Sequence, residues 1–257
     1  AIETFRKCIT NLFRKKNERK DLMLVYAGRI IQPPFFEIGP KAYLYGEEMR
    51  KLARAADAAS ARYGVRVILT PQYTDIPMLT EETENLLIFA QHMDPLPVGR
   101  GLGSVLPEAV KAAGAAGVML NHAEKPMTVS GLRRAIQRAD EVGLLTIVCA
   151  DSLQEAAAIA HFSPNIIVAE PTELIGTGQA ADEEYVRAAI DAVKSVNPAI
   201  QVLPAAGIKD GRDVYRMIRA GADATGSTSG ILNAPDPAAM VDEMLAAVRR
   251  AWDERHA

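Results

Sequence analysis

The sequence predicts a single closed α/β barrel in which eight parallel strands alternate with helices, the (β/α)8 fold. Three observations support this prediction. The chain has 257 residues, which matches the roughly 250 residues of one such barrel. Apolar residues make up 49% of it and aromatic residues only 5%, which suits many short buried strands. From about residue 35 onward, short apolar runs alternate with amphipathic segments.

Eight apolar runs are expected to form the strands, and they lie at residues 35–38, 65–70, 86–90, 117–120, 144–148, 166–169, 202–204 and 222–225. Stretches with helical periodicity include residues 46–63, 128–141, 152–161, 182–195 and 235–252. This alternation implies parallel strands joined by right-handed crossovers, and eight repeats allow the sheet to close. An open doubly wound sheet is the alternative fold.

Residues 1–34 are predicted to be an N-terminal extension and residues 35–257 the barrel. Residues 1–21 carry seven basic side chains against three acidic ones, with apolar residues at roughly helical spacing. This pattern predicts an amphipathic helix that packs on the barrel or on a neighbouring subunit. Binding to an anion or to a membrane surface is the alternative.

Composition favours a small-molecule ligand over a macromolecular one. A net charge of −3 gives no general attraction to nucleic acid or anionic lipid, so an anionic ligand needs a local site. Cys8 and Cys149 show no metal-ligand, redox or disulfide spacing. No run has the length of a membrane span, and the N-terminus lacks the apolar stretch of a signal peptide. We expect a cytoplasmic protein with no metal, cofactor, nucleic acid or membrane partner.

Candidate functional residues follow the predicted strands, because the sites of closed barrels lie just beyond the C-terminal strand ends. Lys41 follows the first strand, His122 and Glu124 follow the fourth, and Glu170 follows the sixth. Taken singly, each has a plainer explanation as a rim charge, a cap or a partly buried histidine.

Small-residue loops after the seventh and eighth strands lead into helices, where backbone N–H groups can hold a phosphate. The residues of these loops that we expect to bind phosphate are Gly207, Lys209, Thr228, Ser229 and Gly230. Some of them have a plainer explanation as turn residues. Together with the ionisable groups, they predict a site for a small phosphorylated substrate.

Four motifs resemble those of archaeal-type triosephosphate isomerases: Phe89-Ala90-Gln91-His92, Asn121-His122, Glu170-Pro171 and Glu173-Leu174-Ile175-Gly176-Thr177-Gly178. The resemblance covers roughly residues 36–245. It implies a TIM barrel isomerase of carbohydrate metabolism and glycolysis that acts on a triose phosphate, with the last motif as a mobile lid and Gly176 near the phosphate.

The resemblance also implies roles for individual residues. Glu170 would abstract the proton next to the carbonyl, His122 would polarise the carbonyl oxygen, Lys41 would face the developing enediolate, and Glu124 would pair with Lys41. A Glu base, a neutral His and a closing loop are established features of this family, so these roles are taken from it. The chemistry requires them, since a weak carbon acid needs both a base and donors to the developing oxygen charge.

The chain departs from the family pattern at three positions. Gly39 stands where Asn is expected, Ala123 where Ser is expected, and Leu102 where a Thr would support that Asn across a dimer. The paired change at Gly39 and Leu102 suggests a remodelled subsite with space for a longer or differently substituted carbon chain. Lys209 adds a cation beside the expected phosphate loop. We still expect a homodimer or homotetramer, joined through the loop at residues 93–104.

Three kinds of function fit these observations. The first is an isomerase for triose phosphate or for a four-carbon ketose phosphate (a tetrulose phosphate). The second is a non-catalytic barrel that binds a phosphorylated metabolite, against which the presence of Lys41, His122 and Glu170 argues. The third is a phosphate-binding barrel enzyme of another reaction, such as a lyase or epimerase, against which the Glu-Pro and lid motifs argue.

Overall fold

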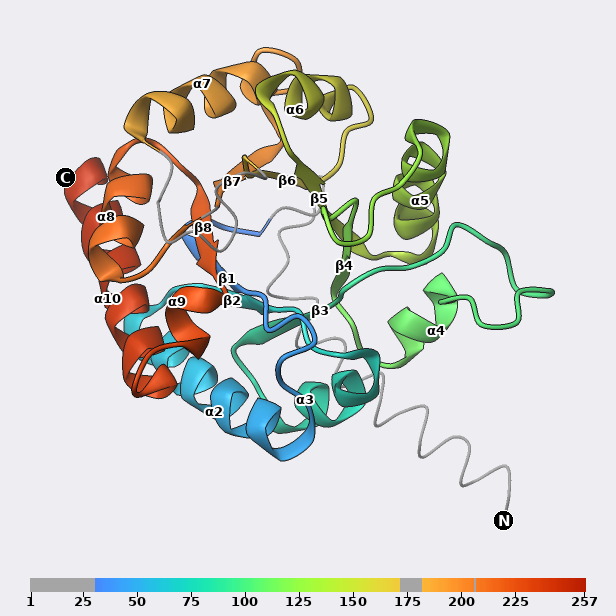
Figure 1. Cartoon of the computed structure of the whole chain (residues 1–257), viewed down its shortest axis with the longest axis horizontal. Coiled ribbons are helices and arrows are strands. Elements are labelled where there is room, and N and C mark those ends of the chain that lie inside the picture. Colours follow the sequence, from blue (N-terminus) through green and yellow to red (C-terminus); the bar gives the residue numbers. More distant parts are fainter. Residues whose placement is uncertain (1–30, 172–181, 206) are drawn as a thin grey trace. The chain divides into compact units, whose positions relative to one another are not determined.

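The computed structural model describes residues 31–171, 182–205 and 207–257. Pro33–Ala257 form one compact unit, in which parallel strands lie at the centre and helices surround them (Figure 1). The strands are β1 (Phe35–Ile38), β2 (Arg66–Leu69), β3 (Leu86–Ala90), β4 (Gly117–Leu120), β5 (Leu145–Ala150), β6 (Ile166–Ala169), β7 (Gln201–Pro204) and β8 (Ala224–Ser227). Each overlaps one predicted run, which confirms the predicted barrel. The segment 1–21 and the motif 173–178 lie outside the described residues, and the domain boundary at residue 34 stays a prediction.

The sheet runs in the order β7-β6-β5-β4-β3-β2-β1-β8, and side chains help to close it between β7 and β8. At this seam the Asp223 carboxylate accepts from Val202 N (3.0 Å), and Asp223 N donates to Val202 O (3.3 Å). The Thr225 hydroxyl donates to Pro204 O (2.8 Å). Because Pro204 has no N–H group, it cannot donate to a strand ladder, so the Thr225 contact helps to join the two strands.

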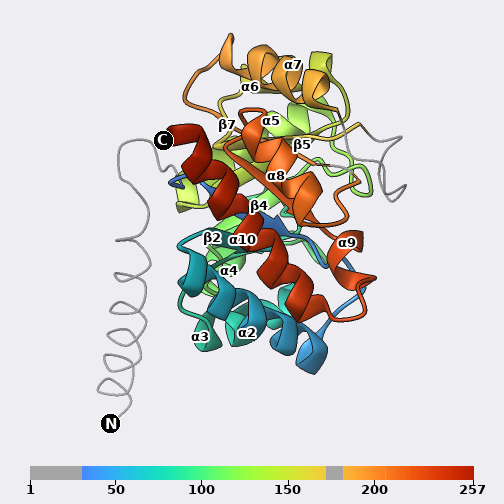
Figure 2. The same ribbon diagram turned by 90° about the vertical axis from the view of Figure 1, so that its left-hand side faces the viewer.

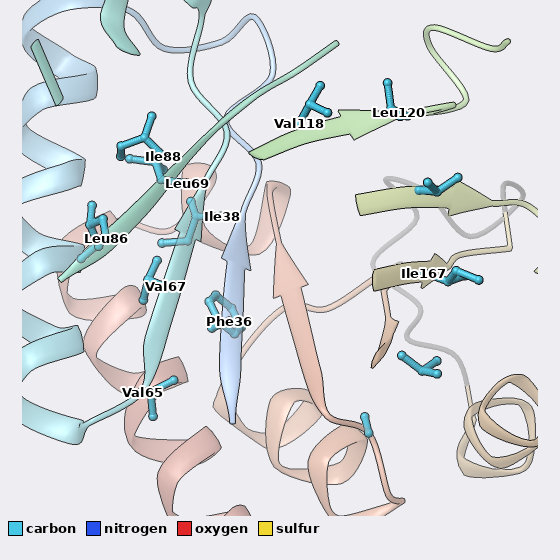
Figure 3. Close-up of a cluster of buried hydrophobic side chains, with 14 of the residues drawn as sticks. Phe36, Ile38, Val65, Val67, Leu69, Leu86, Ile88, Val118, Leu120 and Ile167 are labelled. Carbon is cyan, nitrogen blue, oxygen red and sulfur yellow. The ribbon is translucent and has the colours of Figure 1, made fainter. Parts of the chain in front are cut away.

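Side chains of the strands alternate between the helices and the barrel interior. Phe36 and Ile38 of β1 and Val67 of β2 belong to the buried apolar cluster drawn in Figure 3, together with residues of the surrounding helices. Successive residues of a strand point to opposite faces. Glu37, between Phe36 and Ile38, therefore points into the interior of the barrel.

The helices are α2 (Gly46–Tyr63), α3 (Ile76–Glu82), α4 (Pro107–Ala112), α5 (Val129–Val142), α6 (Leu153–Ala160), α7 (Glu183–Lys194), α8 (Gly211–Arg219), α9 (Ser229–Leu232) and α10 (Pro237–His256), with a 3-10 turn η1 (Tyr73–Asp75). Five of them begin at a residue whose side chain accepts from an N–H of the first turn: Thr128, Ser152, Asp182, Asp210 and Asp236. Helix α10 lies against α8 and α2 (Figure 2). Within the described ranges, no helix is both long and apolar enough to cross a membrane.

Candidate active site

A cavity of about 640 Å³ lies at the C-terminal ends of the strands. Its walls include side chains that follow β1, β4 and β6 and residues of the loops after β7 and β8, namely Lys41, His122, Glu170, Gly207 and Ser229. Residues from distant parts of the sequence thus face one space, which is the usual place of the site in this kind of barrel.

Lys41 is held at the cavity by its backbone and by its ammonium group. It adopts φ 50°, in the left-handed region that a non-glycine residue seldom occupies. Its carbonyl oxygen accepts from the side-chain amides of Gln72 (2.9 Å) and Gln91 (2.7 Å). Its Nζ lies 2.6 Å from Oε1 of Glu124. Lys41 is therefore fixed at both ends, with its positive charge at the cavity.

Asn121 shapes the turn that presents His122. Its φ is 57°, a left-handed conformation that asparagine tolerates better than most residues. Its Nδ2 donates to Cys149 O (3.0 Å) and to Glu155 Oε1 (3.1 Å), while its Oδ1 accepts from Met127 N (2.9 Å). The side chain thus ties this turn to β5 and to the start of α6.

The hydrogen bonds of His122 indicate the form of its ring. Nδ1 accepts from the backbone N–H of Glu124 (3.1 Å), so in the neutral ring the proton resides on Nε2. Burial lowers the pKa of His122, and the charge of Lys41 lowers it further, while Glu124 opposes both. At neutral pH the ring is therefore an uncharged imidazole that can donate through Nε2–H.

Glu124 and Glu170, two of the carboxyl groups near Lys41, have opposite pKa shifts. The hydrogen bond from Lys41 lowers the pKa of Glu124, so Glu124 stays ionised. Burial raises the pKa of Glu170, which Lys41 partly offsets. Glu170 is therefore a better proton acceptor once ionised than an exposed glutamate.

The predicted phosphate residues divide into two groups. Gly207, Thr228 and Ser229 line the cavity. Lys209 is exposed and, like Gly230, is not among the lining residues. The phosphate-binding roles of these five residues stay predictions, and Gly176 lies outside the described residues.

Gly230 lets the loops after β7 and β8 lie together. A Cβ atom on Gly230 would overlap the carbonyl oxygens of Ile208 and Lys209. The Ser227 hydroxyl donates to Ile208 O (2.9 Å) across the same contact. The segment 226–230 was expected to be a loop, but Gly226 and Ser227 end β8 and Ser229 begins the short helix α9. A buried strand of small and polar residues leaves no apolar run by which to recognise it.

Glu37 also lines the cavity, and the sequence reasoning did not include it among the site residues. A Cβ atom on Gly39 would lie 3.0 Å from Glu37 Oε1 and 3.3 Å from Thr228 Oγ1. The space that the missing Asn was expected to leave open is therefore occupied in part by Glu37. Its signal was present in the sequence, since Glu37 is the charged residue within the apolar run 35–38.

Comparison with known proteins gives consistent matches over the barrel. The profile of the triosephosphate isomerase family matches residues 38–244. Triosephosphate isomerase from Methanothermus fervidus is 37% identical over 203 residues, which cover 78% of this chain and 91% of that protein. The enzyme of the same name from Sulfurisphaera tokodaii is 34% identical over 230 residues, covering 88% of this chain and 100% of that protein.

A solved structure supports the fold independently. The crystal structure of triosephosphate isomerase from Bartonella henselae matches with a TM-score of 0.70 at 18% identity, covering 86% of this chain and 100% of that chain. The sequence matches over most of the chain carry the assignment beyond the fold. This chain belongs to the triosephosphate isomerase family and is an isomerase.

Proposed function

We propose that this chain interconverts glyceraldehyde 3-phosphate and dihydroxyacetone phosphate by moving a proton between their neighbouring carbons. The observation that carries the proposal is the convergence of Glu170, His122 and Lys41 on one cavity from the ends of three different strands. The names of the relatives from Methanothermus fervidus and Sulfurisphaera tokodaii support the same substrate.

Glu170 is the proposed base, which removes a proton from the carbon next to the substrate carbonyl and returns it to the neighbouring carbon. Its raised pKa brings its basicity closer to working pH, where general base catalysis is most effective. Because an ionised Glu170 is required, kcat/KM should fall as the pH drops through this pKa.

His122 and Lys41 are the proposed partners of the enediolate oxygens. Nε2–H of a neutral His122 donates to the oxygen on which charge develops and gives it that proton, and Nε2 then takes the hydroxyl proton from the oxygen on the neighbouring carbon. The Lys41 ammonium lowers the energy of the developing charge. The ion pair with Glu124 holds Lys41 in place (2.6 Å). Gly207, Thr228 and Ser229 stand on the wall where the loops after β7 and β8 meet, and we assign the phosphate to that wall.

The test is a coupled assay of the purified chain with C3, C4 and C5 sugar phosphates, beside the variant Glu170→Gln. The chain should turn over triose phosphates, and Glu170→Gln should lose more than about nine-tenths of kcat with a modest change in ligand affinity. If the chain turns over tetrulose phosphates alone, its substrate is a tetrulose phosphate and not a triose phosphate. If it binds sugar phosphates without turning any of them over, it is a non-catalytic barrel. A Glu170→Gln variant with a tenth or more of wild-type kcat would reject Glu170 as the base.

A further inference from the structure

Glu37 is a buried carboxyl group inside the cavity for which the proposed proton transfer has no role. The residue is only 8% exposed, yet it lines the cavity together with Lys41 and Glu170. An unpaired carboxyl group inside a barrel lowers the stability of the fold, because burial penalises its charged form and leaves its polar atoms in need of partners. Its presence on an otherwise apolar strand therefore requires an explanation.

The surroundings of Glu37 are shaped to hold the carboxyl group. The Thr70 hydroxyl of the β2 end donates to Glu37 Oε1 (3.0 Å). On the opposite side, a Cβ atom on Gly226 of β8 would lie 2.8 Å from the backbone oxygen of Glu37 and 2.9 Å from its Oε2. A Cβ atom on Gly39 would lie 3.0 Å from Oε1. The two glycines thus leave room for Glu37, Gly226 for its backbone as well as its carboxyl and Gly39 for the carboxyl alone.

The protonation state of Glu37 follows from its neighbours. Burial raises its pKa to about 8, Thr70 and Lys41 act to lower it, and Glu170 acts to raise it. The Cys149 thiol is the other titratable group that Glu37 affects, and burial already keeps its pKa well above the ordinary value. With its pKa raised to about 8, Glu37 is mostly protonated at neutral pH. It is then a hydrogen-bond donor.

One oxygen of the carboxyl group is left for a ligand. Oε1 accepts from Thr70, whereas among the described residues no hydrogen bond to Oε2 is found. A carboxylic acid with one satisfied oxygen can donate through the other to a hydroxyl or carbonyl oxygen. The family residue missing at position 39 would supply an amide donor at this end of the cavity, and the Glu37 carboxyl now occupies part of its space.

We propose that Glu37 is a substrate-binding residue whose carboxyl group donates a hydrogen bond to a hydroxyl or carbonyl oxygen of the sugar phosphate. This inference rests on the proposed isomerase function. In this proposal the Glu37 carboxyl supplies the donor that an Asn at position 39 would otherwise supply, and Gly39 leaves the space for it. When Glu37 ionises, it loses its donor and places a negative charge beside Glu170 and an anionic substrate, so binding weakens.

Two variants and one control test this assignment by steady-state kinetics across pH. Glu37→Gln keeps the shape and a donor but cannot ionise, whereas Glu37→Leu has no donor. Glu108→Gln is the control, because Glu108 is a carboxylate outside the cavity that pairs with Arg138 (2.5 Å). In wild type and Glu108→Gln, kcat/KM should fall as the pH rises through about 8, which gives the pH profile an alkaline limb. Glu37→Gln should lose this alkaline limb.

Glu37→Leu should lower kcat/KM by about threefold to tenfold at pH 7, mainly through KM, without lowering the melting temperature. Its affinity for inorganic phosphate, which we assign to the loops after β7 and β8, should not change. If both Glu37 variants keep the wild-type kinetics and alkaline limb and only their melting temperatures move, Glu37 is structural and the inference is overturned.

Failure of the proposed function gives a different result. If wild type turns over no triose phosphate, that function is rejected, and Glu37 is then tested by calorimetric binding of dihydroxyacetone phosphate at pH 7 and pH 9. Wild type should bind more weakly at pH 9, and Glu37→Gln should not. Equal pH dependence in the two proteins, or no binding to either, would overturn the inference.

Discussion

Glu37→Gln should change how the stability of the barrel depends on pH, because the two side chains share a shape and only the carboxyl ionises. Burial raises the pKa of Glu37 from 4.5 to about 8. Between these values the folded chain keeps a proton that the unfolded chain has lost, so the free energy of unfolding falls as the pH rises. At about 1.36 kcal/mol per pH unit, the full effect in wild type is about 4–5 kcal/mol, complete only above about pH 8.

The assay is urea unfolding of wild type and Glu37→Gln at intervals between about pH 5 and pH 8. Taking the difference between the two proteins cancels the other titrating groups. The variant should gain about 1.4 kcal/mol relative to wild type for each pH unit over most of this range. Glu108→Gln is the control, because Arg138 holds the pKa of Glu108 below its usual range, so its difference from wild type should stay flat. Parallel curves for Glu37→Gln and wild type would refute the buried, protonated state of Glu37.

Three further predictions concern the site and the assembly. His122→Ala should lower kcat at least about tenfold with little change in KM, and steady-state kinetics showing a change in KM alone would make His122 a binding residue. Gly39→Asn should destabilise the chain by about 1–3 kcal/mol, since its Cβ would lie 3.0 Å from Glu37 Oε1. In a double-mutant cycle Glu37→Ala should relieve most of that cost, whereas strictly additive unfolding energies would disprove the contact. We expect a homo-oligomer joined through the loop at residues 93–104, where Leu102 is fully exposed. Light scattering that finds a fully active monomer at assay concentration would reject this expectation.

The strands were predictable because their signal is local. A run such as 86–90 is apolar throughout and bounded by polar residues, and β3 has those same bounds. Prediction was weakest at β8, expected at residues 222–225 and found at Ala224–Ser227. Its buried Thr225 and Ser227 satisfy their hydroxyls by bonds to Pro204 and Ile208. Those bonds come from neighbouring segments, so nothing in the local pattern marks these residues as strand.

Site residues were predictable for a similar reason. The barrel places strand ends at one mouth, so the chain positions of Lys41, His122 and Glu170 already implied that they share a cavity. The sequence did not indicate the protonation states of these side chains. The neutral, Nε2-protonated ring of His122 depends on the backbone N–H of Glu124, and the raised pKa of Glu170 depends on burial.

By itself, then, the sequence determined the fold class, the order of the elements and the mouth positions of the main ionisable groups, since each follows from periodicity and spacing along the chain. Only the tertiary structure showed the consequence of having Gly39 where the family has Asn, namely that Glu37 occupies part of the space of the missing side chain. Pairing of β1 with β8 brings Gly226 against Glu37, and the Thr228 hydroxyl donates to Gly39 O (2.7 Å) across 189 positions of sequence. The physical reason is barrel closure, which sets the first strand beside the last. The fit between a buried carboxyl and its two glycines exists only once the ends of the sheet have met.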